Sequence, residues 1–279
     1  MTVTDRLPCP PSPQNGAPSA SGRPLIEVDQ LTMAYGDEII QRDLNFTINA
    51  GAIFVIMGGS GCGKSTLLKH LLGLMTPVTG DILYSGTSFP RASAAEQEAM
   101  RRRWGITYQS GGMFSAMTLA ENVALPLELY TAFSPAEIVD IVAYKLALVG
   151  LAGYQAYYPH ELSGGMQKRA ALARAIALDP DILFFDEPSA GLDPISSRLL
   201  DDLIVQLQES TGATIVLVTH ELASIFSIAT NAVYLDTTSR TMIDYGEPHY
   251  MRDHSTQPVV RQFLNRSPDD SQQPRVSNE

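Results

Sequence analysis

Gly58-Gly59-Ser60-Gly61-Cys62-Gly63-Lys64-Ser65 is the stretch of sequence that decides the fold. It matches G-x-x-x-x-G-K-[ST], the pattern of a phosphate-binding loop. An apolar run, Ala52–Met57, precedes it, and a helix-forming run, Thr66–Leu72, follows it. These are the buried strand and the helix that such a loop requires. A glycine-rich turn with an incidental lysine is the alternative, and it is disfavoured because strand, loop and helix stand in the required order.

The chemistry of this loop follows from its residue types. Glycines let the backbone curl so that successive N–H groups face a phosphate, and the helix N-terminus adds its positive dipole end. Lys64 is expected to reach the β- and γ-phosphates of a nucleotide, and the Ser65 hydroxyl is expected to bind Mg²⁺. The predicted nucleotide-binding residues here are Gly58, Gly59, Ser60, Gly61, Cys62, Gly63, Lys64, Ser65 and Thr66.

Composition limits the other functions open to the chain. The 279 residues carry a net charge of −11, which disfavours a general affinity for nucleic acid. The two cysteines, Cys9 and Cys62, lie in a tail and in the loop, so a reducing cytosol is expected. No apolar run approaches the ~20 residues needed to cross a bilayer, and the start lacks the apolar core of a signal peptide. A membrane role would therefore run through a partner.

The pattern along the chain changes from mixed to helical and back. Residues 1–24, rich in Pro, Ser, Gly and Ala, are predicted to be disordered. Strands are expected at Leu25–Val28 and Leu44–Ile48 before the loop. Capping-box patterns at Thr118 and Ser134 then open helices in a segment that predicts a helical insertion.

A second candidate anion site follows the helical segment. Ser163 precedes Gly164 and Gly165 at the expected start of a helix over residues 167–178. Two interpretations remain open at this point. The serine is an ordinary helix cap, or its hydroxyl, the glycine N–H groups and the helix dipole together bind a second anion.

Polar side chains end several predicted strands. Asp186 and Glu187 end the apolar run that begins at Asp181, where paired carboxylates suit a metal ligand and a general base. His220 ends a run from Thr214, at the strand end where open α/β sheets bind ligands, so it is either structural or a contact to the γ-phosphate or Glu187. Gln109 ends a strand from Ile106, as a structural residue or one that reaches Mg²⁺ or water. Tyr35 is an ordinary strand-end aromatic or a surface on which adenine stacks.

Together these motifs resemble the ATP-binding subunits of ABC transporters, from about Leu25 to Met251. The motifs occur in that family's order: the A-loop aromatic Tyr35, Walker A at Gly58–Ser65, the Q-loop Gln109, the signature motif Leu162–Gly165, the Walker B Asp186, the catalytic Glu187, the D-loop Ser189–Asp193 and the switch His220. Met166 departs from the glutamine that many members carry there, although Ser163, Gly164 and Gly165 retain the phosphate contact.

The resemblance implies an α/β P-loop NTPase (RecA-like) core with an antiparallel β subdomain and an inserted α-helical subdomain. It implies an ATPase domain over residues 25–255, with the helical subdomain at about 110–166, and a tail over 256–279 that has a short helix and a disordered end. It also implies ATP with Mg²⁺ bound in a head-to-tail homodimer, with the helical insertion carrying motion to an integral membrane permease. Asp193 of the D-loop joins the predicted nucleotide-binding residues on this basis.

A narrower resemblance is to the ATPases of MCE-type lipid transporters, which maintain phospholipid asymmetry in bacteria. Four passages carry it: Tyr108–Gly111 with Met113 and Phe114, Leu162–Met166 followed by Lys168–Ala175, Thr219–Glu221 with Ser224–Phe226, and Pro258–Leu264. It implies an MCE-domain protein and a small STAS-type accessory subunit as partners. It also implies a place on the cytoplasmic face of the bacterial inner membrane.

Two other functions remain as alternatives. One is the ATPase of another ABC importer or exporter, for an amino acid, a metal or a lipoprotein. The other is a non-transport ABC ATPase of translation or DNA repair. The second is disfavoured because the chain has one ATPase copy and no long coiled-coil insertion.

Overall fold

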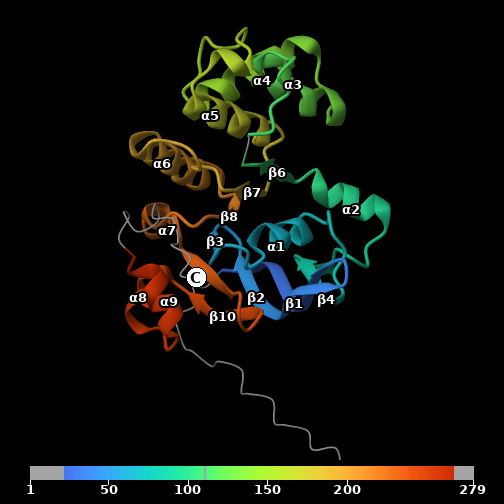
Figure 1. The fold of residues 1–279 in the computed structure, drawn as a ribbon. Coiled ribbons are helices and arrows are strands. Elements are labelled where there is room, and N and C mark those ends of the chain that lie inside the picture. Colours follow the sequence, from blue (N-terminus) through green and yellow to red (C-terminus); the bar gives the residue numbers. More distant parts are fainter. Residues whose placement is uncertain (1–21, 110, 267–279) are drawn as a thin grey trace, which may run out of the picture.

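The computed structural model describes residues 22–109 and 111–266 (Figure 1). Residues 1–21, Ser110 and the end of the chain from 267, where most of the predicted disorder falls, lie outside these residues. The disorder predicted at 22–24 is wrong, because the Arg23 carbonyl accepts from the Ala50 N–H and Pro24 begins a strand paired with Asn49. The central sheet has the strand order β10-β9-β3-β8-β7-β6. Neighbouring strands are parallel except that β10 is antiparallel to β9. Its strands are β3 Ile53–Gly58, β6 Trp104–Thr107, β7 Ile182–Asp186, β8 Thr214–Val218, β9 Asn231–Asp236 and β10 Thr241–Gly246.

A second, antiparallel sheet has the order β2-β1-β4-β5, with β1 Pro24–Tyr35, β2 Glu38–Asn49, β4 Thr79–Tyr84 and β5 Thr87–Ser88. Strands β1 and β2 extend well beyond the predicted Leu25–Val28 and Leu44–Ile48. The reason is an irregular register between them, with Gln30 at φ 44° and Asp43 at φ 53°. These two residues interrupt the period-2 alternation by which a strand is predicted from sequence.

Three helices form a lobe that stands apart from the antiparallel sheet in Figure 1. They are α3 Leu119–Tyr130, α4 Pro135–Leu148 and α5 Gly164–Ala175, with a 3₁₀ turn at Pro159–Glu161. Of these three, the first two lie within the predicted helical segment at about 110–166, and the third begins near its end and runs beyond it. Both predicted capping boxes are confirmed, with Thr118 capping α3 and Ser134 capping α4. The other helices are α1 Lys64–Leu71, α2 Ala94–Arg101, α6 Pro194–Thr211, α7 Leu222–Ile228, α8 Pro248–His254 and α9 Pro258–Leu264.

The central sheet is buried on both faces, which explains why its strands are continuous apolar runs. Alternate side chains of one strand enter different cores. Phe54 and Phe184 pack with the antiparallel sheet and α1, whereas Val55 and Phe185 pack with the helices on the other face. Within residues 22–109 and 111–266, every helix is too short or too polar to traverse a bilayer.

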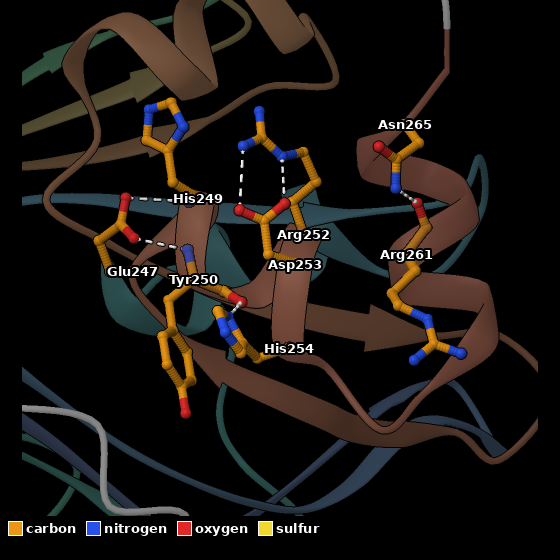
Figure 2. A network of polar contacts seen from close by, with 8 residues as sticks. All are labelled: Glu247, His249, Tyr250, Arg252, Asp253, His254, Arg261 and Asn265. Atoms are coloured by element: carbon orange, nitrogen blue, oxygen red, sulfur yellow. Dashed lines mark hydrogen bonds and ion pairs between the residues drawn. The ribbon is translucent and has the colours of Figure 1, made fainter.

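The short helix predicted after residue 256 is confirmed as α9, and it packs on the central core. The Phe263 ring lies edge-on to Tyr234, with centroids 5.3 Å apart, and both side chains are buried. Figure 2 shows α9 beside α8, where Glu247 caps α8 by accepting from the His249 and Tyr250 N–H groups. The predicted domain boundary at residue 255 stays a prediction, although α9 lies on the same core as β9.

Replacing Phe263 with alanine tests this packing. We expect Phe263→Ala to lower the free energy of unfolding by about 3–5 kcal/mol, because it leaves a cavity against Tyr234. Val259→Ala is the control, since Val259 lies on the same helix with 40% of its surface exposed. Its effect should stay within about 0.5 kcal/mol. Urea unfolding of both variants measures the difference, and equal small losses would show that α9 is not part of the core.

Candidate active site

The phosphate loop leaves the carboxyl end of β3 and enters α1, as predicted. Gly58 has φ 149°, and a Cβ there would lie 2.4 Å from the Leu235 carbonyl oxygen. Gly63 has φ 95°, and a Cβ there would lie 2.6 Å from an Ile40 methyl group. A larger residue at Gly58 would collide with the backbone of β9, and one at Gly63 would collide with the Ile40 side chain of β2 and adopt a strained φ. The loop therefore takes its curled shape from close packing against β9 and β2.

Lys64 folds back over this loop. Its Nζ donates to the carbonyl oxygens of Gly58 and Gly59, each at 3.0 Å. An ammonium group has three N–H donors, so one remains for an anion. The side chain is thus fixed at the loop itself rather than extended into solvent.

Ser65 and Asp186, 121 residues apart, meet beside the loop. The Ser65 hydroxyl donates to Asp186 Oδ1 at 3.3 Å. Burial raises the pKa of Asp186, while the bond from Ser65 and the charges of Lys69 and Lys64 oppose this rise. A half-buried carboxylate that has no ion-pair partner in the described part of the chain is one that a cation would stabilise.

These two oxygen donors fit Mg²⁺. It prefers hard oxygen ligands and is commonly held by one or two side chains together with waters and phosphate oxygens. Residues 22–109 and 111–266 contain no group of three or more His, Cys, Asp or Glu side chains that could hold a metal by themselves.

Glu187 sits in a strained backbone conformation next to Asp186. Its φ of 49° is uncommon for a non-glycine residue, and its N–H donates to the Val218 carbonyl at 2.9 Å. One carboxylate oxygen, Oε1, lies 2.8 Å from Nδ1 of His220. The other, Oε2, is buried and has no hydrogen-bond partner among the described residues. Strain and an unpaired buried acceptor in one residue are typical of a functional group.

His220 lies two residues beyond the end of β8, whereas the sequence predicted that the strand reaches it. The hydrogen bond to Glu187 raises the pKa of His220, and burial opposes that rise. Of the interpretations left open for this histidine, contact with Glu187 is the one observed. The imidazole orients the carboxylate through Oε1, while the buried Oε2 keeps its hydrogen-bonding capacity unused among the described residues.

Gln109 does not end a strand, because β6 stops at Thr107 and Gln109 is exposed. A buried structural glutamine, one of the two alternatives, is therefore wrong. Its backbone carbonyl accepts a hydrogen bond from Lys168 Nζ on α5. Sequence reasoning missed this contact, since nothing local relates two residues 59 positions apart. Tyr35 is 71% exposed at the end of β1, so its ring is not packed as an ordinary core aromatic.

Ser163 caps α5, with its hydroxyl accepting from the Met166 N–H at 3.3 Å. Asp193 likewise caps α6 by accepting from the Ile195 and Ser196 N–H groups. Figure 1 places α5 in the helical lobe and α1 in the body of the domain. Across residues 22–109 and 111–266, no hydrogen bond joins Ser163 to the phosphate loop. The structure thus brings Ser65 to Asp186 and Glu187 to His220 at one strand edge, beside Lys64 of the loop, whereas Ser163–Gly165 lie at the start of α5 in the helical lobe.

Comparison with known proteins agrees with this architecture. Residues 41–190 match the ABC transporter family. The probable ribonucleotide transport ATP-binding protein Mkl of Mycobacterium tuberculosis H37Rv is 42% identical over 250 residues, 88% of this chain and 69% of that protein. The intermembrane phospholipid transport system ATP-binding protein MlaF of Haemophilus influenzae is 46% identical over 205 residues, 74% of this chain and 78% of that protein.

A solved structure gives the same result for the fold. The dimeric ATP-binding cassette MJ0796 in a post-hydrolysis state, bound to ADP and Pi, superposes with a TM-score of 0.71 at 28% identity, covering 80% of this chain and 98% of that one. The chain belongs to the ABC transporter family, as one of its ATP-binding ATPase subunits. The predicted P-loop NTPase fold and ATPase class are confirmed.

One buried carboxylate near the site makes a pH prediction possible. Asp201 on α6 is 5% exposed and accepts a hydrogen bond from Ser224 on α7 at 2.7 Å. Burial raises the pKa of Asp201 from 3.8 to about 6, against the opposing effect of the Ser224 bond. The native state therefore binds this proton more tightly than the unfolded state does. The contribution of the protonated Asp201 carboxyl to stability is fully present below pH ~4 and is lost as the pH rises through about 6.

At pH 8 we expect Asp201→Asn to raise the free energy of unfolding by about 1–3 kcal/mol over that of the natural protein, as measured by urea unfolding. The reason is that an amide keeps the Ser224 bond and carries no charge. The difference should narrow as the pH falls to 5. Asp202→Asn, at the exposed neighbouring position, is the control and should show no such narrowing. A pH-independent difference between Asp201→Asn and the natural protein would contradict the prediction.

Proposed function

We propose that this chain hydrolyses ATP to drive an ABC transporter that moves phospholipid between bacterial membranes and so maintains outer-membrane lipid asymmetry. The observation that carries the ATPase chemistry is the meeting of Ser65, Asp186, Glu187 and His220 beside the phosphate loop. The observation that carries the lipid assignment is the 46% identity to a phospholipid transport ATPase over most of both chains.

In the proposed mechanism, residues 58–66 bind the β- and γ-phosphates, and Tyr35 stacks on the adenine. When bound, Mg²⁺ would be held by Ser65 and Asp186, with Gln109 near it, and would neutralise charge on the phosphate oxygens. Glu187 accepts the proton of the attacking water at Oε2, the oxygen that lacks a partner. His220 holds Oε1, so the carboxylate cannot rotate away from the water.

The residues at the start of α5 are proposed to act on the nucleotide of a neighbouring subunit. The N-terminus of α5, with Ser163, Gly164 and Gly165, presents N–H groups and a helix dipole that suit a γ-phosphate. Asp193 lies at the start of α6, close enough to this motif that a Cβ on Gly165 would lie 3.5 Å from the Ser196 Cβ. A head-to-tail homodimer brings Ser163 of one copy to the phosphate loop of the other. The dimeric state named for the MJ0796 cassette supports this arrangement.

The helical lobe is the proposed contact for an integral membrane permease. Large apolar side chains are exposed on it and beside Gln109: Tyr108 43%, Phe114 51%, Leu129 64%, Tyr130 45% and Phe133 48%. Exposed apolar side chains of this number suggest a protein contact. The subunit would then lie on the cytoplasmic face of the inner membrane. An MCE-domain protein and a small STAS-type subunit are the proposed further partners, and nucleic acid is not one.

A different cargo is the second candidate. Mkl, at 42% identity, is named for ribonucleotide transport, so likeness alone does not select between lipid and another substrate. Purification of the tagged chain from membranes decides between them. Under the proposal, a permease and an MCE-domain protein copurify, and phospholipid vesicles exchange labelled lipid only with ATP. Copurification with a soluble periplasmic binding protein, and no lipid exchange, would support the other cargo.

Glu187→Gln tests the catalytic assignment. We expect turnover to fall by ~10²–10⁴, the usual size of a general-base contribution, with ATP affinity retained. Glu161→Gln is the matched control, since Glu161 lies in the 3₁₀ turn outside the proposed catalytic group. Steady-state ATPase rates and nucleotide binding of the full complex measure both. Turnover within a factor of two of the natural protein would remove Glu187 from the proposed role.

A further inference from the structure

Gln41 is a buried polar residue directly behind the phosphate loop. It lies on β2 with none of its surface exposed. Its side-chain Nε2 donates to the Cys62 carbonyl at 2.7 Å and to the Asp236 carbonyl at 3.0 Å. Its Oε1 has no partner in the described part of the chain. Burial of an amide is costly unless it is hydrogen-bonded, so these two contacts account for how the side chain is held.

The bond to Cys62 determines how the next peptide group points. In a trans peptide the C=O and the following N–H point in opposite directions, and none of the described peptide bonds is cis. Because Gln41 holds the Cys62 carbonyl toward β2, the Gly63 N–H points away from β2. No hydrogen bond from this N–H lies within residues 22–109 and 111–266. The N–H is therefore left for a ligand of the loop.

The bond to Asp236 connects the loop to a rigid support. Asp236 ends β9, and its carboxylate accepts from the N–H groups of Thr238 and Ser239 at 3.1 and 2.7 Å. Strand β9 pairs with β3, the strand that feeds the loop. The side-chain amide of Gln41 on β2 thus connects the phosphate loop to the end of β9.

We propose that Gln41 is a positioning residue for nucleotide binding, which fixes the Cys62–Gly63 peptide so that the Gly63 N–H faces a phosphate oxygen. This inference rests on the proposed binding of phosphates by residues 58–66. Gln41 touches no reacting atom. Its loss affects the cradle of the β- and γ-phosphates, which ADP shares in part with ATP, and leaves Glu187 and His220 unchanged.

Gln41→Met tests the proposal, because methionine has a similar length and no N–H donor. We expect Kd for both ATP and ADP, measured by calorimetry on the full chain, to rise about tenfold. In the assembled complex, kcat at saturating ATP should stay within about twofold, because the lost interaction is common to ground and transition states. An unchanged Kd for both nucleotides in a folded Gln41→Met protein would overturn the proposal.

Gln208→Met is the matched control. Gln208 on α6 also donates through Nε2 to a backbone carbonyl, that of Gly51 at 2.7 Å, but at the opposite end of β3 from the loop. It should lower thermal stability and leave both Kd values unchanged. If Gln208→Met weakens nucleotide binding as much as Gln41→Met does, general destabilisation explains the effect and the positioning role is wrong.

If Gln41→Met does not fold, a second variant at the same position still tests the proposal. Gln41→Asn keeps the amide but withdraws it by one methylene, so it should also raise Kd for both nucleotides, and natural affinity would overturn the proposal. Lys64→Ala separates this proposal from the function on which it rests. If Lys64→Ala binds ATP normally, the phosphate site itself is misplaced. If Lys64→Ala loses ATP while both Gln41 variants keep it, only the role of Gln41 fails.

Discussion

The close approach of the phosphate loop to the strands behind it is the constraint on which the rest of the site depends. At Gly58 a single added carbon would meet the Leu235 carbonyl oxygen and the Cys62 sulfur, and at Gly63 it would meet Ile40. Interiors packed at this density do not deform gradually, so the loop has one shape set by both sheets. That shape places Lys64 over its own backbone and Ser65 at the strand edge beside Asp186. Core packing therefore sets where the backbone of the reactive groups lies, and the hydrogen bonds of Ser65 to Asp186 and of His220 to Glu187 then orient their side chains.

Burial of the central sheet on both faces then gathers the carboxylates. Strands β3, β7 and β8 run parallel, so their carboxyl ends share one edge. Side chains before that edge are apolar because each enters one of the two cores, and polar groups occur where the cores end. Asp186 is the last residue of β7, and Glu187 and His220 follow within two residues of a strand end. The catalytic group therefore lies at the carboxyl-end edge of the central sheet, because the apolar cores end at that edge.

The parts of this structure that sequence could predict are those set by local chemistry. The loop pattern and the caps at Thr118, Ser134 and Ser163 depend on residues near one another in the chain. Strand lengths in β1 and β2 were underestimated because Gln30 and Asp43 break the alternation. The short helices α7 and α8 carry little periodicity of their own, and the sequence did not predict them.

Contacts between distant segments account for the remaining gaps. In the sequence Gln41 follows two isoleucines in a strand whose other face is polar, so nothing marks it as a residue that holds a loop. The same applies to Lys168 and the Gln109 carbonyl, and to Asp201 and Ser224. In each case tertiary packing determines which polar group is the hydrogen-bond partner. The role of the residue can therefore be inferred only from the hydrogen bonds in the folded structure.

The separation of Ser163 from the phosphate loop has an energetic consequence for the proposed dimer. Within one chain, a phosphate bound at the phosphate loop does not reach the N-terminus of α5, so it cannot gain binding energy from both sites. If the γ-phosphate touches both a loop and a neighbouring α5, its binding energy is realised only in the closed dimer. Its loss on hydrolysis then removes that differential affinity, and the closed state is no longer favoured. Because the helical lobe carries α5 together with the exposed side chains proposed to meet the permease, dimer closure and permease movement would be one rearrangement.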